Sequence, residues 1–524
     1  MSLGTAPSQK SIFDEASEYC AERLSERSVY SWLHRERERL FPDGDFADLY
    51  STRGRRSVAP SVVATVMVLQ RLEGCSDREA VERFAFDVRW RYAAGVSGWG
   101  EDACREFVHT VLVDMRERLR GSARPDRIFE ASLEAAKSAG VLGRRRVLDS
   151  TALYDAVTTM DTVTLIRSAM RSLLQVCDAE LAQELRAVIR SGDDYASTAK
   201  PQIDWSDPEA RHELIDSRAR DAFACLAQLE GRELSPAVSE ASRLLATVIG
   251  QDLETEEDGS LRIARRVARD RVISTVDPEA RHGHKTSSRG FDGYKGNVAV
   301  DPDSEVITKT AVTPANAGEV SVAEELIDDL LGDDGEAVEA TVYGDSAYGS
   351  GEFQARLQNA GIDSRCKTQP ASNADGFFSK DRFAIDLKQG TVTCPAGHTV
   401  LIQRYEKRSD AASFGTLCAA CPLRSQCTRA TAGRTIRIGP YEEALSQARQ
   451  RQNLESWRAD YRATRPKIER KIGHMMRRRH GGRRARVRGR GKVDADFRLL
   501  AAALNLTRLA VLGIRSTAEG WAVA

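Results

Sequence analysis

The sequence predicts an α+β protein in which an all-helical N-terminal domain precedes a mixed-sheet domain that carries a helical insertion and a Cys-rich insertion. Three observations predict this class. Helical patterning fills residues 1–125, short apolar runs typical of strands occur at 144–153 and 293–313, and four of the ten cysteines fall between 394 and 427. The chain has 524 residues, enough for several domains with cores of their own.

Residues 1–125 are predicted to form the helical N-terminal domain. Apolar residues fill 61–71 almost without interruption, and Gly74 then ends the expected helix. The segment 76–79, Ser-Asp-Arg-Glu, is a capping-box signature for a second helix. The buried face of that helix is expected to contain Ala80, Val81, Phe84 and Ala85. Two helices joined by a short Gly-containing turn fit a helix-turn-helix unit, which in different proteins contacts DNA or only packs. The sequence gives both interpretations equal weight.

The first strand is expected where basic residues at 144–146 precede a short apolar run and a carboxylate. We predict that this strand ends at Asp149 or shortly after it. Residues 155–280 then return to a helical pattern, with apolar residues at spacings of three and four and a polar break at 193–208. This stretch is therefore predicted to be a helical insertion between two strands of one sheet.

Residues 285–370 complete the predicted sheet. The segments 293–301 and 305–313 have strand patterns and flank a Pro-Asp-Ser turn, so we expect a hairpin. The stretch 321–340 contains eight acids and no base, and its apolar residues keep helical spacing. It is interpreted as an amphipathic helix with a solvated acidic face, a structural element. The elements expected after it are a strand over 337–343, a helix near 351–360 and a strand over 362–367.

The order of these elements is strand, two-stranded hairpin, helix, strand, helix and strand, which is the order of a ribonuclease H-like sheet. Residues 140–154 and 285–370 would form this catalytic core. Asp149 and Asp345 each lie at or near the end of a predicted strand, where α/β folds place catalytic groups. Two convergent carboxylates suit Mg²⁺, and a pair of such ions can hold both the attacking and the leaving oxygen of a phosphodiester displacement.

A third acid is expected from a helix that lies against the sheet, within the C-terminal segment 441–515. Residues 461–490 contain 13 Lys and Arg and a single acid, Glu469. On a helix Glu469 shares a face with Arg465. This arrangement predicts a metal-binding carboxylate among cations that hold DNA phosphates. The alternative is that Glu469 only pairs with Arg465 and its neighbours, and the order of the strands favours the site.

At this point the sequence resembles the DDE transposases of bacterial insertion sequences. The motifs that carry the resemblance are Leu148-Asp149-Ser150-Thr151, Gly293-Tyr294-Lys295-Gly296, Thr313-Pro314-Ala315-Asn316, Tyr343-Gly344-Asp345-Ser346-Ala347-Tyr348 and Ile468-Glu469-Arg470-Lys471-Ile472-Gly473. Residues 53–96 are similar to the helical N-terminal domain of those enzymes, and 481–489 and 501–506 to their closing segment. The resemblance covers most of 50–512 except the helical insertion. It implies that Asp149, Asp345 and Glu469 are the D, D and E, and that they hold two Mg²⁺ or Mn²⁺ ions.

One departure concerns the residues around the glutamate. Related transposases carry a Tyr, two residues, an Arg, three residues, the Glu, six residues and a Lys. Arg465 fits the Arg position, but Tyr461 lies one residue too early and Met476 occupies the Lys position. Arg477 is the available cation, although Arg and Lys are not equivalent. The roles of the Tyr and the Lys in gripping the transposon end therefore do not carry over directly.

The resemblance implies double-stranded DNA as the partner, both as transposon terminal inverted repeats and as target DNA. It also implies hydrolytic cleavage at the element's ends, joining of the freed 3′-OH to the target, and a homodimer in the synaptic complex. Candidate DNA contacts are Lys285, Lys295, Tyr461, Arg462, Arg465, Arg477, Arg483, Arg484 and Arg486. Two alternatives are a nuclease of the same fold without strand transfer and a domesticated DNA-binding protein that no longer cuts.

The cysteines within the predicted insertion 371–440 indicate a second metal site. Cys418 and Cys421 have the C-x2-C spacing of a metal knuckle, Cys427 follows, and Cys394 lies upstream. Four thiolates form a closed tetrahedral zinc site, which is structural. The alternatives are free thiols, or His398 in place of one cysteine.

Composition excludes several other classes of protein. Lys and Arg together number 77, as do Asp and Glu, and hydrophobic residues make up 41%, values typical of a globular chain. Apolar runs such as 62–69 are far too short to span a bilayer. The sequence has no phosphate-binding Gly-x4-Gly-Lys-Ser/Thr loop, so nothing implies ATP. We therefore expect a cytoplasmic protein that associates with the nucleoid.

Overall fold

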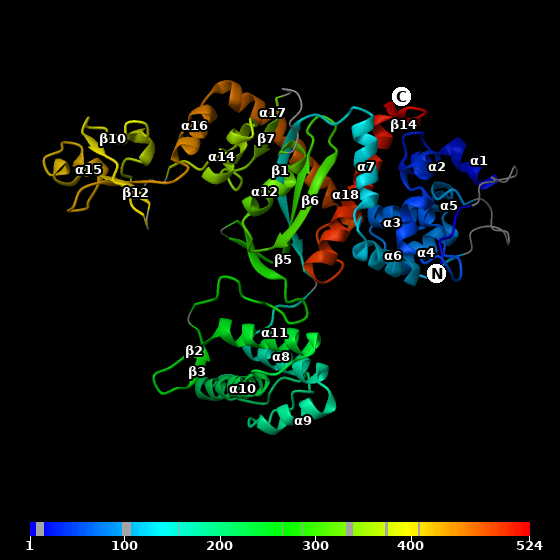
Figure 1. Cartoon of the computed structure of the whole chain (residues 1–524), viewed down its shortest axis with the longest axis horizontal. Helices are drawn as coiled ribbons and strands as arrows, with labels where there is room; N and C mark the ends of the chain where they lie inside the picture. The colour runs from blue at the N-terminus through cyan, green and yellow to red at the C-terminus, as the bar shows by residue number, and fades with distance from the viewer. Residues whose placement is uncertain are drawn as a thin grey trace.

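The computed structural model describes residues 1–6, 15–96, 106–155, 157–264, 266–286, 288–331, 339–371, 376–406 and 409–524. A central sheet separates a helical domain from two projecting parts (Figure 1). One projecting part is the helical insertion, and the other is the Cys-rich segment at the opposite end from the helical domain (Figure 1). Within the described residues, no helix has both the length and the apolar composition for crossing a bilayer.

The N-terminal domain is helical, as the sequence predicts. Its helices are α1 (Glu15–Arg23), α2 (Val29–Leu40), α3 (Pro60–Glu73), α4 (Asp77–Phe86), α5 (Val88–Ala93), α6 (Thr110–Gly121) and α7 (Arg127–Ser138). Helix α3 ends at Gly74, which adopts φ 69°, and Ser76 and Glu79 form the predicted capping box of α4. Ala80, Phe84 and Ala85 are buried, whereas Val81 is only partly buried. Because α3 is buried from Pro60 to Leu72, it is the central core helix of this domain and leaves no face for DNA.

The C-terminal helix α18 (Arg490–Leu512) joins the two ends of the chain in one core. It packs against α3, α7 and the sheet, so N-terminal helices, sheet and C-terminal helix share a single apolar cluster. The buried amide of Asn505 accepts from Ile307 N and donates to Ile307 O, both at 2.8 Å. Arg71 Nε of α3 lies 3.1 Å from Asp496 Oδ2. The C-terminal segment is therefore an integral part of the fold.

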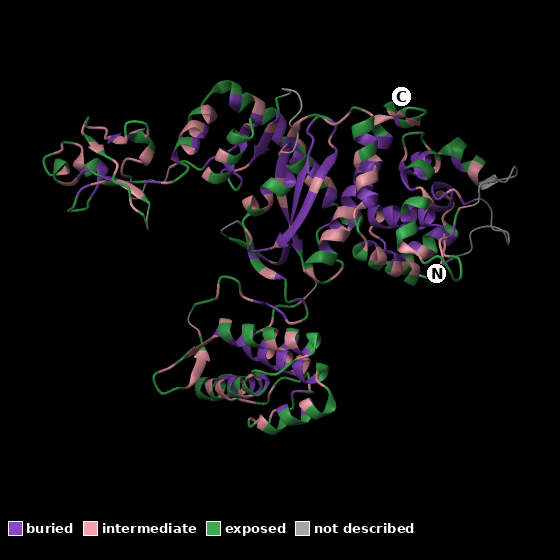
Figure 2. Ribbon diagram, viewed as in Figure 1, coloured by how far each residue is buried: buried purple, intermediate pink, exposed green. Residues whose placement is uncertain are grey.

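The sheet is mixed, as the sequence predicts. Its strands are β1 (Arg145–Tyr154), β4 (Arg281–Thr286), β5 (Arg289–Val300), β6 (Ile307–Pro314), β7 (Thr341–Gly344) and β8 (Asp363–Cys366). Strand β1 is antiparallel to β5 and parallel to β7, and β5 also pairs with β6 and β4. With α12 (Ala323–Leu326) and α14 (Gly351–Asn359), the elements follow the predicted order, except that β4 is an additional strand that was not predicted. The middle of the sheet is buried by the elements around it (Figure 2).

Two details of the sheet correct the sequence-based expectation. Strand β1 continues five residues past Asp149, because β5 pairs with it as far as Tyr154 opposite Gly293. The acidic helix is broken into α12 and α13 (Asp328–Leu331), and its acids are not simply solvated. They form ion pairs of 3.2 Å between Glu324 and Arg356, 2.6 Å between Asp328 and Lys309, and 2.5 Å between Asp329 and Arg146. Residues 332–338, where this helix was expected to end and the next strand to begin, lie outside the described residues.

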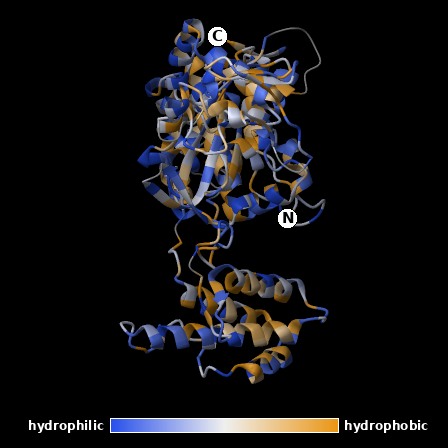
Figure 3. Ribbon diagram, turned by 90° about the vertical axis from the view of Figure 1, so that its left-hand side faces the viewer, coloured by the Kyte–Doolittle hydropathy of each residue, from blue (hydrophilic) through white to orange (hydrophobic). Residues whose placement is uncertain are grey.

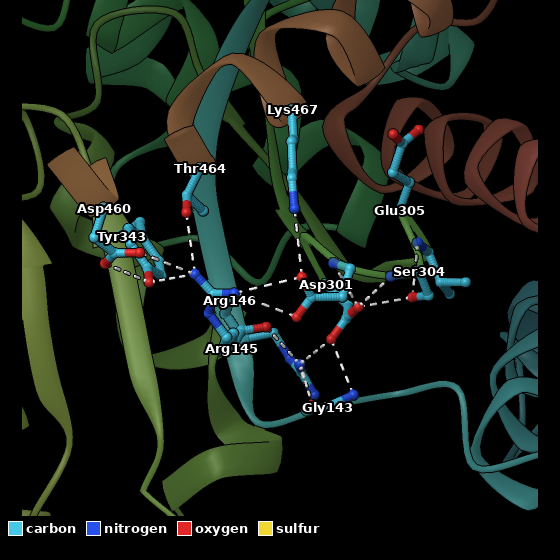
Figure 4. Close-up of polar contacts among 12 residues, drawn as sticks. Gly143, Arg145, Arg146, Asp301, Ser304, Glu305, Tyr343, Asp460, Thr464 and Lys467 are labelled. Carbon is cyan, nitrogen blue, oxygen red and sulfur yellow. Dashed lines mark hydrogen bonds and ion pairs between the residues drawn. The ribbon is translucent and has the colours of Figure 1, made fainter. Parts of the chain in front are cut away.

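Helix α17 (Glu455–Met475) crosses the sheet at β1 and β7 and is tied there by polar contacts (Figure 4). Arg145 Nη2 donates to Tyr343 Oη at 2.6 Å and to Thr464 Oγ1 at 3.0 Å. Tyr343 Oη in turn donates to Asp460 Oδ2 at 2.8 Å (Figure 4). This network fixes the first half of α17 on the sheet, and therefore fixes which side of the next turns faces β1.

The helical insertion is a separate small bundle with a core of its own. It consists of α8 (Thr162–Val176), α9 (Ala179–Val188), α10 (Pro208–Leu229) and α11 (Pro236–Asp252). Figure 3 shows it below the main body, joined by narrow connections. The predicted polar break lies between α9 and α10, where Asp193 Oδ2 pairs with Arg167 at 2.8 Å and with Arg218 at 3.0 Å.

The Cys-rich part contains only short elements around a small apolar cluster. These elements are β9 (Ala384–Asp386), β10 (Thr391–Thr393), β11 (Thr399–Leu401), β12 (Asp410–Ser413), α15 (Arg424–Cys427) and β13 (Thr435–Ile438). Helix α16 (Glu442–Gln452) leads back from it to α17. Short strands around a small core bury little apolar surface.

Candidate active site

Asp149 and Asp345 come together because β1 and β7 are neighbouring parallel strands. Asp149 lies within β1, opposite Val298 of β5, and Asp345 directly follows β7. Strand β7 pairs with β1 only over residues 145–147 of β1. From Leu148 onward, the edge of β1 that faces β7 is therefore open to other groups. The side chain of Asp149 is 16% exposed and that of Asp345 42% exposed. The structure therefore brings together the two aspartates that the sequence singles out.

Arg465 of α17 reaches into this opening and contacts every acid of the predicted triad. Its Nη2 lies 2.9 Å from Asp149 Oδ2 and 4.0 Å from Asp345 Oδ2, and its Nε lies 3.8 Å from Glu469 Oε1. Its Nη1 donates to Leu148 O at 2.6 Å. The guanidinium is 10% exposed, so a buried cation neutralises the carboxylates in this structure.

Glu469 stays at the edge of the site. Its side chain is 63% exposed, and its ion pair with Arg465 is the i,i+4 pair that the alternative interpretation predicts. The carboxylate that joins the two aspartates is instead Glu319: ligand atoms of Asp149, Glu319 and Asp345 all lie within 4.8 Å of one another. Among the described residues this is the one such group of three or more metal-binding side chains.

The sequence analysis missed Glu319, although a signal was available. Glu319 lies three residues after the Thr313–Asn316 motif and begins the short helix η2 (Glu319–Val322) just after β6. The strong contrast between Glu469 and its basic neighbours directed attention to α17. The available signal was an acid soon after β6, the strand whose end carries that motif.

Burial controls the protonation of the cluster. Burial raises the pKa of Asp149, against the opposing charge of Arg465 and a hydrogen bond from Ser150 N at 2.8 Å. Burial likewise raises the pKa of Glu319, where the charges of Asp345 and Asp149 add to the effect. Three clustered carboxylates are a donor set that a divalent cation would stabilise. The residues present therefore fit Mg²⁺ or Mn²⁺.

The predicted DNA contacts fall into two groups. Tyr461 is buried, stacks on Trp457 with ring centroids 5.0 Å apart, and donates to Gly344 O at 3.3 Å. Lys295 Nζ donates to Ala317 O at 2.9 Å and lies 3.9 Å from Glu319. With Arg465, these side chains make internal contacts. The exposed group consists of Lys285 on β4, Arg462 on α17, and Arg477, Arg483, Arg484 and Arg486.

The basic segment 482–486 runs beside the open end of β1. Tyr154 N donates to Arg483 O and Ala485 N donates to Tyr154 O, both at 2.8 Å. Arg483 and Arg484 are exposed there, along the same strand that carries Asp149. Arg486 instead donates to Cys75 O of the helical domain. Tertiary structure thus brings two of the cations to the strand of the acid cluster and turns the third toward a structural contact.

The four cysteines surround one small cavity. Cys394, Cys418, Cys421 and Cys427 line it together with His398. All four are described residues, yet no three of their sulfurs lie within 4.8 Å of one another. Arg434 N donates to Cys418 Sγ at 3.4 Å. Four thiols and an imidazole around one cavity fit Zn²⁺ in donor chemistry.

Two family models of transposases match the chain. The model described as Transposase DDE domain matches residues 393–510, and the one described as Transposase domain (DUF772) matches residues 21–118. The first match includes Arg465 and Glu469 but neither aspartate, and the second covers most of the helical domain. No curated protein and no solved structure matches the chain.

Proposed function

We propose that this chain, which the family matches indicate to be a DDE-type transposase of an insertion sequence, cleaves transposon ends and joins their 3′-OH groups to target DNA. The observation that carries the proposal is the convergence of Asp149 and Asp345, from adjacent strands of a mixed sheet, on Arg465 of α17. Glu469 lies one helical turn further along α17 and completes the predicted acid triad. The catalytic domain would be ribonuclease H-like, with the helical bundle and the Cys-rich part as its insertions.

In this proposal Asp149, Asp345 and Glu469 hold two Mg²⁺ or Mn²⁺ ions. When bound, such ions stabilise the charge of the phosphodiester displacement and lower the pKa of water. Arg465 now neutralises the two aspartates, so it has to give way or turn toward a phosphate when metal enters. The 63% exposure of Glu469 leaves its carboxylate accessible from the side on which DNA would approach.

Double-stranded DNA is the proposed partner, both as terminal inverted repeats and as target. Arg483 and Arg484, exposed beside β1, support a phosphate-binding role close to the cut site. Lys285, Arg462 and Arg477 are further exposed cations for this role. The helical domain would contribute to end recognition through elements other than the buried α3. Holding two ends at once requires a homodimer in the synaptic complex, and the DNA involved would be that of the nucleoid.

For the Cys-rich part we propose a structural Zn²⁺ held by Cys394, Cys418, Cys421 and Cys427. Closing the site would need the four thiols to move closer together around the cavity that they already line. Metal binding would then supply stability that the small apolar cluster of this part does not provide.

The test uses the full chain with Mg²⁺, a DNA fragment carrying one terminal repeat, and a supercoiled target plasmid. Asp149→Asn, Asp345→Asn and Glu469→Gln should each abolish cleavage while leaving binding of the end largely intact, because the cationic surfaces remain. Wild-type protein should cleave the end and join it to the plasmid. Cleavage without joining would favour the nuclease, and full cleavage by Glu469→Gln would remove Glu469 from the triad.

A further inference from the structure

We infer that Glu319 is a metal-ligating carboxylate of the catalytic centre, which acts with Asp149 and Asp345 before a transposon end is bound. The inference rests on the proposed function and adds to it a residue that the D, D, E pattern does not contain. It assigns the centre two glutamates from different elements: Glu319 from η2, which follows β6, and Glu469 from α17.

The position of Glu319 follows from the local chain. Strand β6 ends at Pro314, and Asn316 Nδ2 then donates to Asp270 Oδ1 at 2.9 Å and to Arg269 O at 3.2 Å. Helix η2 starts at Glu319 itself. The side chain is 18% exposed, and its carboxylate lies within 4.8 Å of those of Asp149 and Asp345. The placement is therefore built into the fold and is not a chance position of a surface glutamate.

The charges around Glu319 are unbalanced toward the negative. Lys295 is the base paired with it, at 3.9 Å, and its ammonium donates to Ala317 O at 2.9 Å. Arg465 pairs with Asp149 and Asp345 on the other side of the cluster. If Glu319 served only in a structural ion pair, its carboxylate would be expected in direct contact with the ammonium of Lys295. Here the carboxylate is placed against two other carboxylates, which costs stability unless a cation of higher charge joins them.

An independent observation is the hydroxyl of Tyr348. Tyr348 is fully buried, and in the described structure its Oη has no hydrogen-bond partner. Burial raises the pKa of this hydroxyl well above its ordinary value, and the charges of Glu319, Asp149 and Asp345 add to the effect against that of Arg465. Buried hydroxyls without a partner are rare, and one beside a carboxylate cluster indicates a missing polar ligand such as metal-bound water.

The two glutamates are expected to act at different stages. Glu319 already lies among the aspartates, whereas Glu469 is largely exposed and touches only their partner Arg465 among the site residues. Metal affinity without DNA should therefore depend on Glu319 more than on Glu469. Cleavage should depend on both.

The experiment is a calorimetric titration of the full chain with Mn²⁺ in the absence of DNA. Glu319→Gln should weaken Mn²⁺ binding at least about tenfold, in the range seen when a metal site loses a supporting group. Glu324→Gln is the matched control, because Glu324 lies five residues further on and pairs with Arg356 at 3.2 Å outside the cluster. This control should bind Mn²⁺ as wild type does. Asp149→Asn tests the centre itself.

The outcomes separate the inference from the proposed function. If Asp149→Asn binds Mn²⁺ as wild type does, the proposed centre is wrong. If Asp149→Asn binds weakly and Glu319→Gln binds normally, only the role of Glu319 is wrong. Thermal melting without metal checks folding, and Glu319→Gln should melt at or above the wild-type temperature because it relieves repulsion. Glu319 would be a purely structural residue if Glu319→Gln had a lower Tm than the wild type while both Glu319→Asp and Glu319→Gln kept the wild-type affinity for Mn²⁺.

Discussion

Arg465 Nη2 lies 2.9 Å from Asp149 Oδ2, and Nη1 of the same guanidinium donates to the adjacent backbone carbonyl of Leu148 at 2.6 Å. One side chain of α17 thus binds both the carboxylate of Asp149 and the backbone of β1. Without metal this ion pair compensates a buried negative charge. Arg465 is therefore as much a part of the site as the acids.

Removing this cation should destabilise the metal-free protein. We expect Arg465→Met to lower the free energy of unfolding by about 1–3 kcal/mol, because Asp149 would keep a buried carboxylate without its partner. Mn²⁺ should restore part of the loss, since it supplies a cation at the same place. Urea unfolding with and without Mn²⁺ measures both effects. Arg462→Met is the control, because Arg462 is exposed and pairs with exposed Glu455, and its cost should stay below about 1 kcal/mol. Equal losses in the two variants would contradict the prediction.

Purified protein should contain about one Zn²⁺ per chain if the four thiols close into one site. Cys421→Ser should lower both the metal content and the Tm, because metal binding to such a site contributes to folding. Elemental analysis and thermal melting check the two effects. Cys177→Ser is the control, since Cys177 lies in the helical insertion and should leave the metal content unchanged. Protein without any thiophilic metal would favour free thiols.

The exposed arginines beside β1 should govern the salt dependence of DNA binding. Replacing Arg483 and Arg484 by Ala should flatten the log–log salt slope by up to about two units, near 0.9 per lost phosphate contact. Sequence preference should change little, because phosphate contacts position the duplex and base contacts specify it. Arg486→Ala should mainly lower the free energy of unfolding and change the salt slope little, since Arg486 donates to Cys75 O. Binding of end DNA measured over a salt series tests this, and an unchanged slope in the double variant would refute it.

Two histidines between residues 461 and 490, His474 and His480, predict acid sensitivity. Burial lowers the pKa of His474 to about 4, and burial also lowers the pKa of His480. As pH falls below about 6.5, these histidines bind protons in the unfolded chain but not in the folded protein. The free energy of unfolding therefore decreases between about pH 6.5 and the lowered pKa values of the folded protein. His474→Gln should reduce the loss measured by urea unfolding between pH 7 and 5. The change that His474→Gln makes in the free energy of unfolding should be smaller than about 1.4 kcal/mol per pH unit, because water screens the partly exposed ring. A pH dependence that is the same in His474→Gln and in the wild type would contradict this prediction.

Local patterns in the sequence predicted much of the fold correctly. The capping box at Ser76, the strand order around the two aspartates and the break between α9 and α10 are all present. Each depends on residues a few positions apart, so hydrophobic periodicity and capping chemistry suffice to predict it. The end of β1 was placed too early, because strand length depends on how far the partner strand β5 continues.

The residues that could carry chemistry were identifiable from the sequence alone: the two aspartates of the predicted strands, Glu469 as the single acid of residues 461–490, and the spaced cysteines. Which of these residues meet depends on the packing of the whole chain. It placed Glu319 between the aspartates, left Glu469 at the rim, and turned Arg486 away from Arg483 and Arg484. These outcomes depend on how β6, α17 and the C-terminal segment pack across long distances in the chain. Packing is set by shape and burial over the whole core, which no local pattern of residues contains.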